Sequence, residues 1–203
     1  MEQEDTRTRI LNAARREFLS FGFGGSSLRR IAGNAGVTTG AFYGYFKSKT
    51  QVFDALVEDT YETILSSYRR VLTEFDALPA DRQQTDMDFY TAREVRKLTD
   101  FVYSRLPEFK LILCASEGTR YDHLIGDLAG LDVEATHSFK KQMEDMGLPM
   151  KTVNPMLEHM LTSGMFSAFF ELVIHDVPRD QAEGYITQLL EFYSAGWQKI
   201  MGF

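Results

Sequence analysis

The strongest constraint on the fold of this chain is a long helical pattern of apolar residues that begins at Val52 and ends at Phe75. Apolar side chains recur there at every third or fourth position, which is the spacing of one face of an α-helix over about seven turns. Ser48 precedes the pattern at a position that suits a helix N-cap. No part of the chain shows the strict polar and apolar alternation of a half-buried strand, so we expect an all-α fold.

The same periodicity predicts about nine helices along the whole chain, with ends marked by glycine, proline and capping residues. Leu78 to Gln84 lack the pattern and are expected to form a loop. Thr85 to Asp88 match a Ser/Thr-x-x-acid capping box, so the next helix is expected to begin there. Besides 48–75, the expected helices cover about residues 6–22, 28–35, 39–46, 85–105, 107–118, 121–146, 155–175 and 179–201.

Charge is divided unevenly along the chain. The 203 residues include 22 basic and 29 acidic side chains, which give a formal net charge of −7. Residues 1–50 hold eight Lys and Arg against four acidic residues, a net charge of +4, whereas residues 51–203 carry −11. Such asymmetry indicates a basic module that faces a polyanion, joined to an acidic body. We therefore place a domain boundary between residues 50 and 51.

Composition also bears on the compartment. The single cysteine, Cys114, excludes an intramolecular disulfide and fits a reducing cytoplasm. The N-terminus, MEQEDTR, is polar and acidic, whereas a signal peptide begins with basic residues and an apolar run. The most apolar later stretch, Gly164 to Ile174, is about half the length of a membrane span. We therefore expect a cytoplasmic protein with no membrane partner.

The stretch from Gly36 to Lys49, GVTTGAFYGYFKSK, has the composition of a helix that is supported from behind and pressed against a partner. Phe42 and Phe46 lie four residues apart and can pack on the preceding short helix, at Leu28, Ile31 and Val37. The opposite side combines short side chains with groups suited to phosphates: Thr38, Thr39, Gly40, Ala41, Tyr43, Lys47 and Lys49. This order of helix, glycine turn and helix is that of a helix-turn-helix. The period alone fits a packing helix with solvated lysines equally well.

The segment from Gly22 to Glu58 resembles the DNA-binding segment of the TetR family of bacterial transcriptional regulators. In that family a T/S-S-x-x-x-I-A helix, an A-G-V turn, an x-G-x-[LF]-Y-x-[YH]-F-x-[SN]-K recognition helix and the start of a long fourth helix follow in this order. The resemblance covers about the first quarter of the chain. The residues in register are Ala32, Ala35, Gly36, Val37, Gly40, Tyr43, Phe46 and Lys49.

The resemblance implies a DNA-binding domain over residues 1–50 and specific roles within it. Ser27 would donate to a phosphate, and Arg29 would reach a phosphate or a base edge, where a bidentate contact to guanine discriminates best. Arg30, like Lys47, could equally be solvated. Gly44 departs from the family pattern, so we expect base discrimination to rest on Arg29, Thr39 and DNA shape. The implied DNA-contacting residues are Ser27, Arg29, Thr38, Thr39, Gly40, Tyr43, Tyr45, Lys47 and Lys49.

The last two expected helices are apolar over more than one face, which exceeds the single stripe of a surface helix. Gly164, Ser167 and Ala168 are small enough for close helix approach. We therefore expect a homodimer, in which these helices form a four-helix bundle between two subunits; a buried pair within a monomer is the alternative. The expected interface residues are Met165, Phe169, Leu172, Ile186, Leu189, Tyr193 and Trp197.

Residues 51–203 would hold the effector-binding and dimerisation domain. Aromatic and soft apolar side chains there can line an adaptable cavity for a small hydrophobic or aromatic effector, although most would be ordinary core. A single Glu-x-x-His, Glu134 to His137, falls short of a paired metal motif, so we expect no metal and no cofactor. The candidate pocket residues are Phe89, Phe101, Phe109, Cys114, Tyr121, Phe139, Met160 and Phe166.

These expectations define a homodimeric regulator, a repressor that a small molecule releases from a palindromic operator in double-stranded DNA. An enzyme is not expected, because the chain lacks a nucleophile elbow and a phosphate loop. The alternatives are an all-helical partner-binding protein with a degenerate head and, further off, a helical-bundle enzyme.

Overall fold

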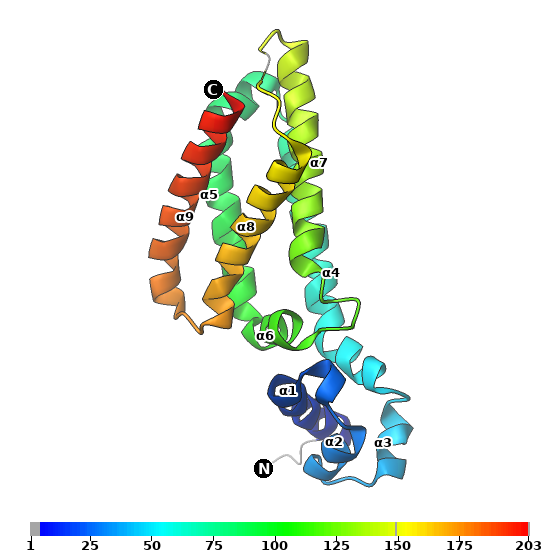
Figure 1. Cartoon of the computed structure of the whole chain (residues 1–203). Helices are drawn as coiled ribbons and strands as arrows, with labels where there is room; N and C mark the ends of the chain where they lie inside the picture. The colour runs from blue at the N-terminus through cyan, green and yellow to red at the C-terminus, as the bar shows by residue number, and fades with distance from the viewer. Residues whose placement is uncertain (1–4, 149, 203) are drawn as a thin grey trace. The chain divides into compact units, whose positions relative to one another are not determined.

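The computed structural model describes residues 5–148 and 150–202, leaving out the side chains of residues 80, 81, 84–86, 88 and 89. Over these ranges the chain folds into nine α-helices and contains no strand, which confirms the expected all-α class (Figure 1). The helices are α1 (Thr6–Gly25), α2 (Leu28–Asn34), α3 (Thr39–Tyr45), α4 (Lys49–Asp76), α5 (Ala80–Ser104), α6 (Leu106–Ala115), α7 (Leu124–Asp145), α8 (Pro155–Ile174) and α9 (Arg179–Met201).

Local sequence signals account for most helix ends. The side chains of Ser27, Thr38 and Asn154 accept backbone N–H groups at the starts of α2, α3 and α8, as N-caps do. Gly22 has a φ of 67°, a left-handed value that glycine adopts without strain, and it interrupts the helical geometry of α1 where the sequence predicts an end. Gly36, also at a φ of 67°, forms the turn before α3.

The expected loop at residues 78–84 is wrong, because α5 already begins at Ala80. Gln83 is fully buried, and its Nε2 donates to the carbonyls of Asp76 at 3.0 Å and of Leu78 at 2.9 Å. A buried amide therefore satisfies the end of α4, and a long loop is not needed. The predicted capping box at Thr85 to Asp88 consequently lies inside α5 and does not begin a helix.

The chain divides into two compact units, and the division differs from the predicted boundary at residue 50. Unit 1 comprises residues 1–63 and 105–124, and unit 2 comprises residues 64–104 and 125–203. In unit 1, α6 packs against α1 and buries Phe109, Leu111 and Ile112. Arg15 of α1 also lies 2.8 Å from Glu108 of α6. Unit 1, which contains the predicted DNA-binding domain and is called the head below, therefore includes α6, from far along the sequence, in its core.

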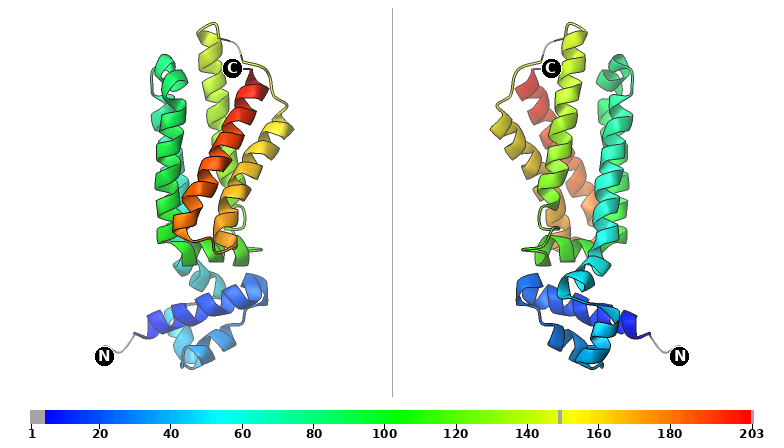
Figure 2. Two further views of the ribbon diagram at one scale, coloured as in Figure 1. Left: turned by 90° about the vertical axis from the view of Figure 1, so that its left-hand side faces the viewer. Right: turned by 90° about the vertical axis from the view of Figure 1, so that its right-hand side faces the viewer.

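Unit 2 is built from the second half of α4 with α5, α7, α8 and α9, and α8 and α9 run side by side (Figure 2). Its interior includes polar groups. The Tyr68 hydroxyl donates to the carboxylate of Asp132, and burial raises the pKa values of both groups. Glu158 is only 1% exposed. Among the described residues, no helix has the length and apolar character that crossing a bilayer would require.

Candidate nucleic-acid interface

Helix α3 is held from behind by its two phenylalanines. Phe42 is fully buried and Phe46 is 3% exposed, with ring centroids 6.0 Å apart. Ile31 of α2 is also fully buried, while Leu28 and Val37 are half-buried. The guanidinium of Arg7 lies 5.5 Å from the Phe46 ring, on the side of α1. The apolar side of α3 is thus committed to the head, which leaves its other side for a partner.

The outward side of α3 carries short and aromatic residues. Thr39, Gly40 and Ala41 are exposed, and so are Tyr43 and Tyr45, at 44% and 48%. A Cβ placed on Gly40 would meet only the Thr38 Oγ1, at 3.9 Å, so nothing within the head requires glycine there. The backbone of α3 is therefore open to close approach from outside.

Two of the predicted DNA contacts at the ends of α3 also serve the helix itself. The Thr38 hydroxyl oxygen accepts the N–H of Ala41 at 3.1 Å, so its main local role is that of an N-cap. At the other end, the Lys47 ammonium donates to the carbonyl of Tyr43 at 3.0 Å while remaining exposed. Lys47 therefore supports the last turn of α3 and still faces solvent.

The two arginines of α2 are both exposed but differ in their partners. The Arg29 guanidinium forms no ion pair or hydrogen bond with any residue that the structure describes. The Arg30 guanidinium lies 2.6 Å from the buried carboxylate of Glu17 and stacks over the ring of Phe21, at 4.5 Å. Ser27 caps α2 by accepting the N–H of Arg30, at 3.5 Å, which leaves its hydroxyl proton able to reach a phosphate.

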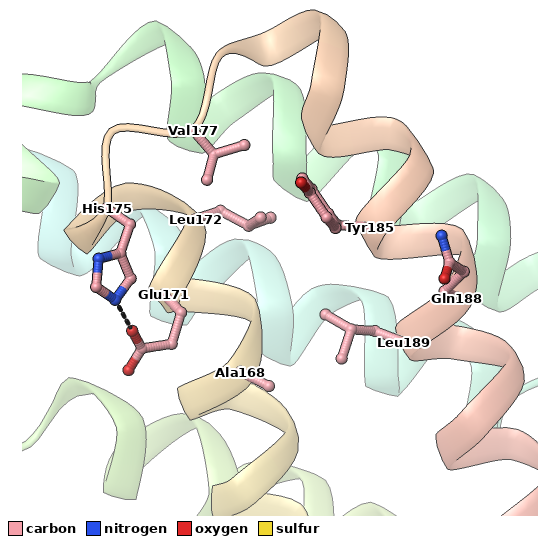
Figure 3. Close-up of a pocket in the computed structure, with 8 residues that line it drawn as sticks. All are labelled: Ala168, Glu171, Leu172, His175, Val177, Tyr185, Gln188 and Leu189. Carbon is pink, nitrogen blue, oxygen red and sulfur yellow. Dashed lines mark ion pairs between the residues drawn. The ribbon is translucent and has the colours of Figure 1, made fainter.

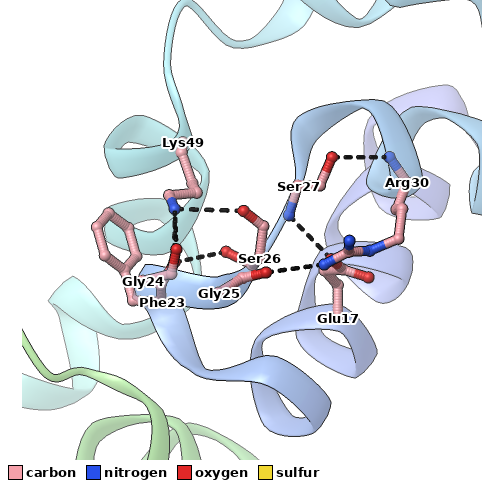
Figure 4. A network of polar contacts seen from close by, with 8 residues as sticks. All are labelled: Glu17, Phe23, Gly24, Gly25, Ser26, Ser27, Arg30 and Lys49. Carbon is pink, nitrogen blue, oxygen red and sulfur yellow. Dashed lines mark hydrogen bonds and ion pairs between the residues drawn. The ribbon is translucent and has the colours of Figure 1, made fainter.

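Lys49 departs from the prediction that it holds a phosphate. Its ammonium donates to the carbonyl of Phe23 at 2.6 Å and to those of Gly24 and Ser26 at 3.3 Å (Figure 4). It also lies 4.6 Å from the centroid of the Phe23 ring. In the free chain, three carbonyls thus take up the donors that a phosphate would need.

The predicted effector residues do not come together in one place. Phe109 and Tyr121 belong to unit 1 and are buried in its core, where the Tyr121 hydroxyl donates to Asp54 at 2.9 Å. Cys114, also in unit 1, is exposed. Phe101, Phe139 and Phe166 are at least half-buried in unit 2, and the Phe166 ring contacts Tyr68 with centroids 5.5 Å apart. The side chain of Phe89 lies outside the described residues.

The expected dimer residues are mostly used within the chain. Phe169, Leu172 and Ile186 are at most 8% exposed, and Met165, Leu189, Tyr193 and Trp197 are half-buried. The small residue Gly164 accommodates a side chain of the same subunit, because a Cβ there would lie 3.4 Å from the Tyr193 hydroxyl. The close approach that the sequence predicted between subunits is thus found between α8 and α9 of one chain.

A different apolar face remains uncovered on α8 and α9. Met156 and Met160 of α8 are 66% and 61% exposed, and Tyr185 and Phe192 of α9 are 52% and 72% exposed. Met160 therefore belongs to this face, and the predicted position inside a pocket is wrong. None of the four is among the expected interface residues, although spacings of four and seven residues place each pair on one side of its helix.

The same two helices border an open hollow of about 370 Å³ (Figure 3). Leu172 of α8 and Val177 line one side of it, and Tyr185 and Leu189 of α9 stand across from them (Figure 3). Glu171 and His175, 2.7 Å apart, form an ion pair at its edge. Of the predicted effector residues, the seven whose side chains the structure describes do not line this hollow, which adjoins the uncovered apolar face at Tyr185.

Sequence reasoning also missed Glu17, whose side chain is 2% exposed. Glu17 follows Ala13 by four residues and precedes Phe18, so it stands among the buried positions of α1. An acidic residue on the apolar side of an amphipathic helix was the available signal, since such a group is buried only with a partner.

An exposed helix, braced by a shorter one across a glycine turn and rich in groups that suit phosphates and bases, defines a helix-turn-helix DNA-binding head. The family model described as "Bacterial regulatory proteins, tetR family" matches residues 10–56. This segment of the chain belongs to the TetR family.

Known proteins extend this result in two ways. The HTH-type transcriptional regulator TtgR of Pseudomonas putida is 40% identical over 62 residues, which is 30% of either chain, so the match spans less than a third of that relative. A member of the TetR transcriptional regulator family from Streptomyces coelicolor shares the fold over 91% of this chain and 88% of its own, with a TM-score of 0.58 and 15% identity. FadR from Bacillus subtilis, solved with stearoyl-CoA, does so over 91% and 96%, with a TM-score of 0.53 and 17% identity. These named proteins are regulators and not enzymes.

Proposed function

We propose that the chain is a DNA-binding transcriptional regulator that represses genes from a palindromic operator. The observation that carries the proposal is the surface formed by Arg29 of α2 with Thr39, Gly40, Tyr43 and Tyr45 of α3. These residues are exposed, the helix beneath them is held by buried phenylalanines, and the segment matches the TetR family model. Arg29 supplies base discrimination, and the two tyrosine hydroxyls with Ser27 and Lys47 supply contacts to phosphates.

A homodimer is part of this proposal, because two heads are needed to read two half-sites of a palindrome. The uncovered face of Met156, Met160, Tyr185 and Phe192 supports it. Large apolar side chains that remain exposed in contiguous patches indicate an interface. The hollow beside Tyr185 extends the same face, so side chains of a second subunit would have a recess to fill.

A small hydrophobic effector that acts on unit 2 completes the proposal. The half-buried pair of Tyr68 and Asp132 offers hydrogen-bonding groups next to the aromatic ring of Phe166, a combination that ligand sites commonly use. FadR from Bacillus subtilis, which shares the fold, was solved in complex with stearoyl-CoA, and this supports the proposal of a small-molecule effector. The effector would release DNA only to the extent that it binds the DNA-free conformation more tightly. Operation in a reducing cytoplasm fits this scheme.

Two alternatives remain distinguishable. The first is a protein that binds another partner and whose helix-turn-helix has lost the ability to bind DNA. It would keep the fold and fail to bind DNA. A helical-bundle enzyme has the least support, since the named relatives are transcriptional regulators.

The test is binding of the purified chain to labelled DNA from upstream of its own gene, measured by fluorescence anisotropy over a range of salt concentrations. We expect two chains per site and an affinity that falls steeply with salt, by a slope of about 0.9 for each phosphate contacted. Selection from a random DNA pool should enrich a palindrome. Failure to bind either the upstream DNA or any selected sequence would contradict the proposal.

A further inference from the structure

The segment from Gly22 to Ser27, called the linker below, comprises the kink and last turn of α1 and the junction to α2. It is rich in glycine, yet its carbonyl groups are held by side chains. Lys49, in the first turn of α4, donates to the carbonyls of Phe23, Gly24 and Ser26 at 2.6 to 3.3 Å. Arg30 donates its Nη2 to the carbonyl of Gly25 at 2.8 Å. Two cations from different helices thus hold consecutive carbonyls from Phe23 to Ser26 (Figure 4).

A buried carboxylate ties the same linker to α1. Glu17 accepts the backbone N–H of Ser27 at 2.9 Å and the Nε of Arg30 at 2.7 Å. Ser27 is the N-cap of α2, and Arg29 is the second residue of that helix. The contacts of Glu17, Arg30 and Lys49 therefore meet at the point where α2 begins.

We propose that Lys49 is a positioning residue, which acts with Arg30 and Glu17 to hold the linker and preset Ser27 and Arg29 for DNA, and that it is not a phosphate ligand. The inference rests on the DNA binding proposed above. Glycine loses more backbone freedom on ordering than any other residue, so a linker containing Gly22, Gly24 and Gly25 needs strong contacts to stay in one conformation. Hydrogen bonds from charged donors are stronger than neutral ones. If the linker is already ordered in the free protein, DNA binding does not have to bear the entropy loss of ordering it.

The two roles of a lysine leave different signatures in the salt dependence. A lysine that contacts phosphate releases counterions on binding, so its removal lowers both the affinity and the slope of log affinity against log salt. A lysine that only orders the free protein changes the affinity at every salt concentration by the same factor. The slope therefore separates the two roles.

The experiment compares Lys49→Met, which keeps an unbranched stem beside Phe23, with Lys49→Arg and with Lys47→Met. We expect Lys49→Met to lower DNA affinity about 10- to 100-fold with an unchanged salt slope. Lys49→Arg should recover most of the loss, because a guanidinium also donates to carbonyls. Lys47→Met, which removes the exposed cation of a proposed phosphate contact, should lower the slope by about one. Hydrogen exchange of the amides from Gly24 to Arg29, in the absence of DNA, should be at least about tenfold faster in Lys49→Met.

A second variant tests the entropy argument and guards against misfolding. Gly24 has no positive φ, and a Cβ there meets nothing within 4 Å, so Gly24→Ala stiffens the linker without strain. Added to Lys49→Met, it should restore the affinity about two- to fivefold. A slope lowered by about one in Lys49→Met, or unchanged exchange from Gly24 to Arg29, would overturn the proposal. If the wild-type chain binds no DNA, the proposed function fails, whereas the exchange result still decides whether Lys49 orders the linker.

Discussion

The outward surface of α2 and α3 in the head differs from the outward surface of α8 and α9 in unit 2. The first exposes Arg29, threonines, tyrosine hydroxyls and a glycine above a buried phenylalanine pair, whereas the second exposes Met156, Met160 and Phe192. Both surfaces need a partner, but the partners differ in chemistry. The polar surface suits a polyanion that also presents base edges to be read. Burial of the apolar surface against another apolar surface lowers the free energy.

The contrast shows how to separate a surface residue from a residue that supports a surface. In the head, Arg29 and Arg30 are exposed neighbours of the same type, yet only Arg30 is paired with a buried carboxylate. In unit 2, Phe169 and Phe192 lie on the two adjoining helices, and only the second is exposed. Residue type alone does not assign a role in either region.

The largest expected effect concerns the apolar surface. Replacing Met160 and Phe192 together by glutamate should give a monomer, because paired charges would have to lose their water in the interface. Operator affinity should fall about 1000-fold, since only one half-site is read at a time. Sedimentation would give the subunit state and anisotropy the affinity. Leu148→Glu, a charge at a residue 47% exposed beyond α7, is the control and should leave both unchanged. A double variant that stayed dimeric would remove this face from the proposed interface.

The second effect tests the polar surface. Arg29→Ala should lower operator affinity up to about 100-fold and relax the preference at one base pair in each half-site, because a bidentate contact discriminates by about 1–3 kcal/mol. Competition among operator variants with single base changes would measure both. Arg70→Ala, at an exposed position of α4 in unit 2, should change neither. An equal loss on all sequences would make Arg29 a phosphate contact only.

The third effect concerns charge inside unit 2. The Lys140 ammonium and the His137 Nε2 each lie 2.8 Å from Glu158. Burial by itself would raise the pKa of Glu158, but these two partners outweigh it and hold the pKa below its usual value. Lys140→Met should therefore lower the free energy of unfolding by about 2 kcal/mol at neutral pH.

The sign of the pH dependence follows from the lowered pKa of Glu158. The pair stabilises the native state above the carboxyl's unfolded pKa of about 4.3, and this contribution disappears as pH falls through the lower native pKa. The difference between wild type and Lys140→Met in urea unfolding should thus shrink below about pH 4. A difference that is constant from pH 7 to pH 3 would show that Lys140 acts by packing alone.

The smallest effect separates the fold of the head from its function. Gly40→Ala should raise the free energy of unfolding of the head by up to about 1 kcal/mol, because the new methyl meets only Thr38 and helix propensity improves. The same change should weaken DNA binding if the backbone of α3 approaches the DNA closely. Gly44→Ala is the matched variant, since a Cβ there meets nothing within 4 Å. If the two changes affected DNA affinity equally, DNA would come no closer to the backbone at Gly40 than at Gly44.

Prediction from sequence succeeded where a signal acts locally. Ser27, Thr38 and Asn154 cap helices in the structure, as short polar side chains do next to a helical pattern, and Gly22 interrupts α1 where an end was expected. It failed at residues 78–84, where the buried amide of Gln83 and not the local pattern decides where α5 begins. Local helix propensity contains no information about a hydrogen-bonding partner that becomes available only when the chain folds.

By itself the sequence determined the helical class, the positions of most helix ends and the presence of a helix-turn-helix head, because periodicity and caps act over a few residues. Tertiary structure decided which cations face outward, which apolar side of α8 and α9 stays exposed, and that α6 belongs to the head. Those outcomes depend on contacts between residues far apart in sequence, such as Lys49 with Phe23 and Arg15 with Glu108. A helical period shows that a side is apolar, but only packing decides whether that side is covered within the chain.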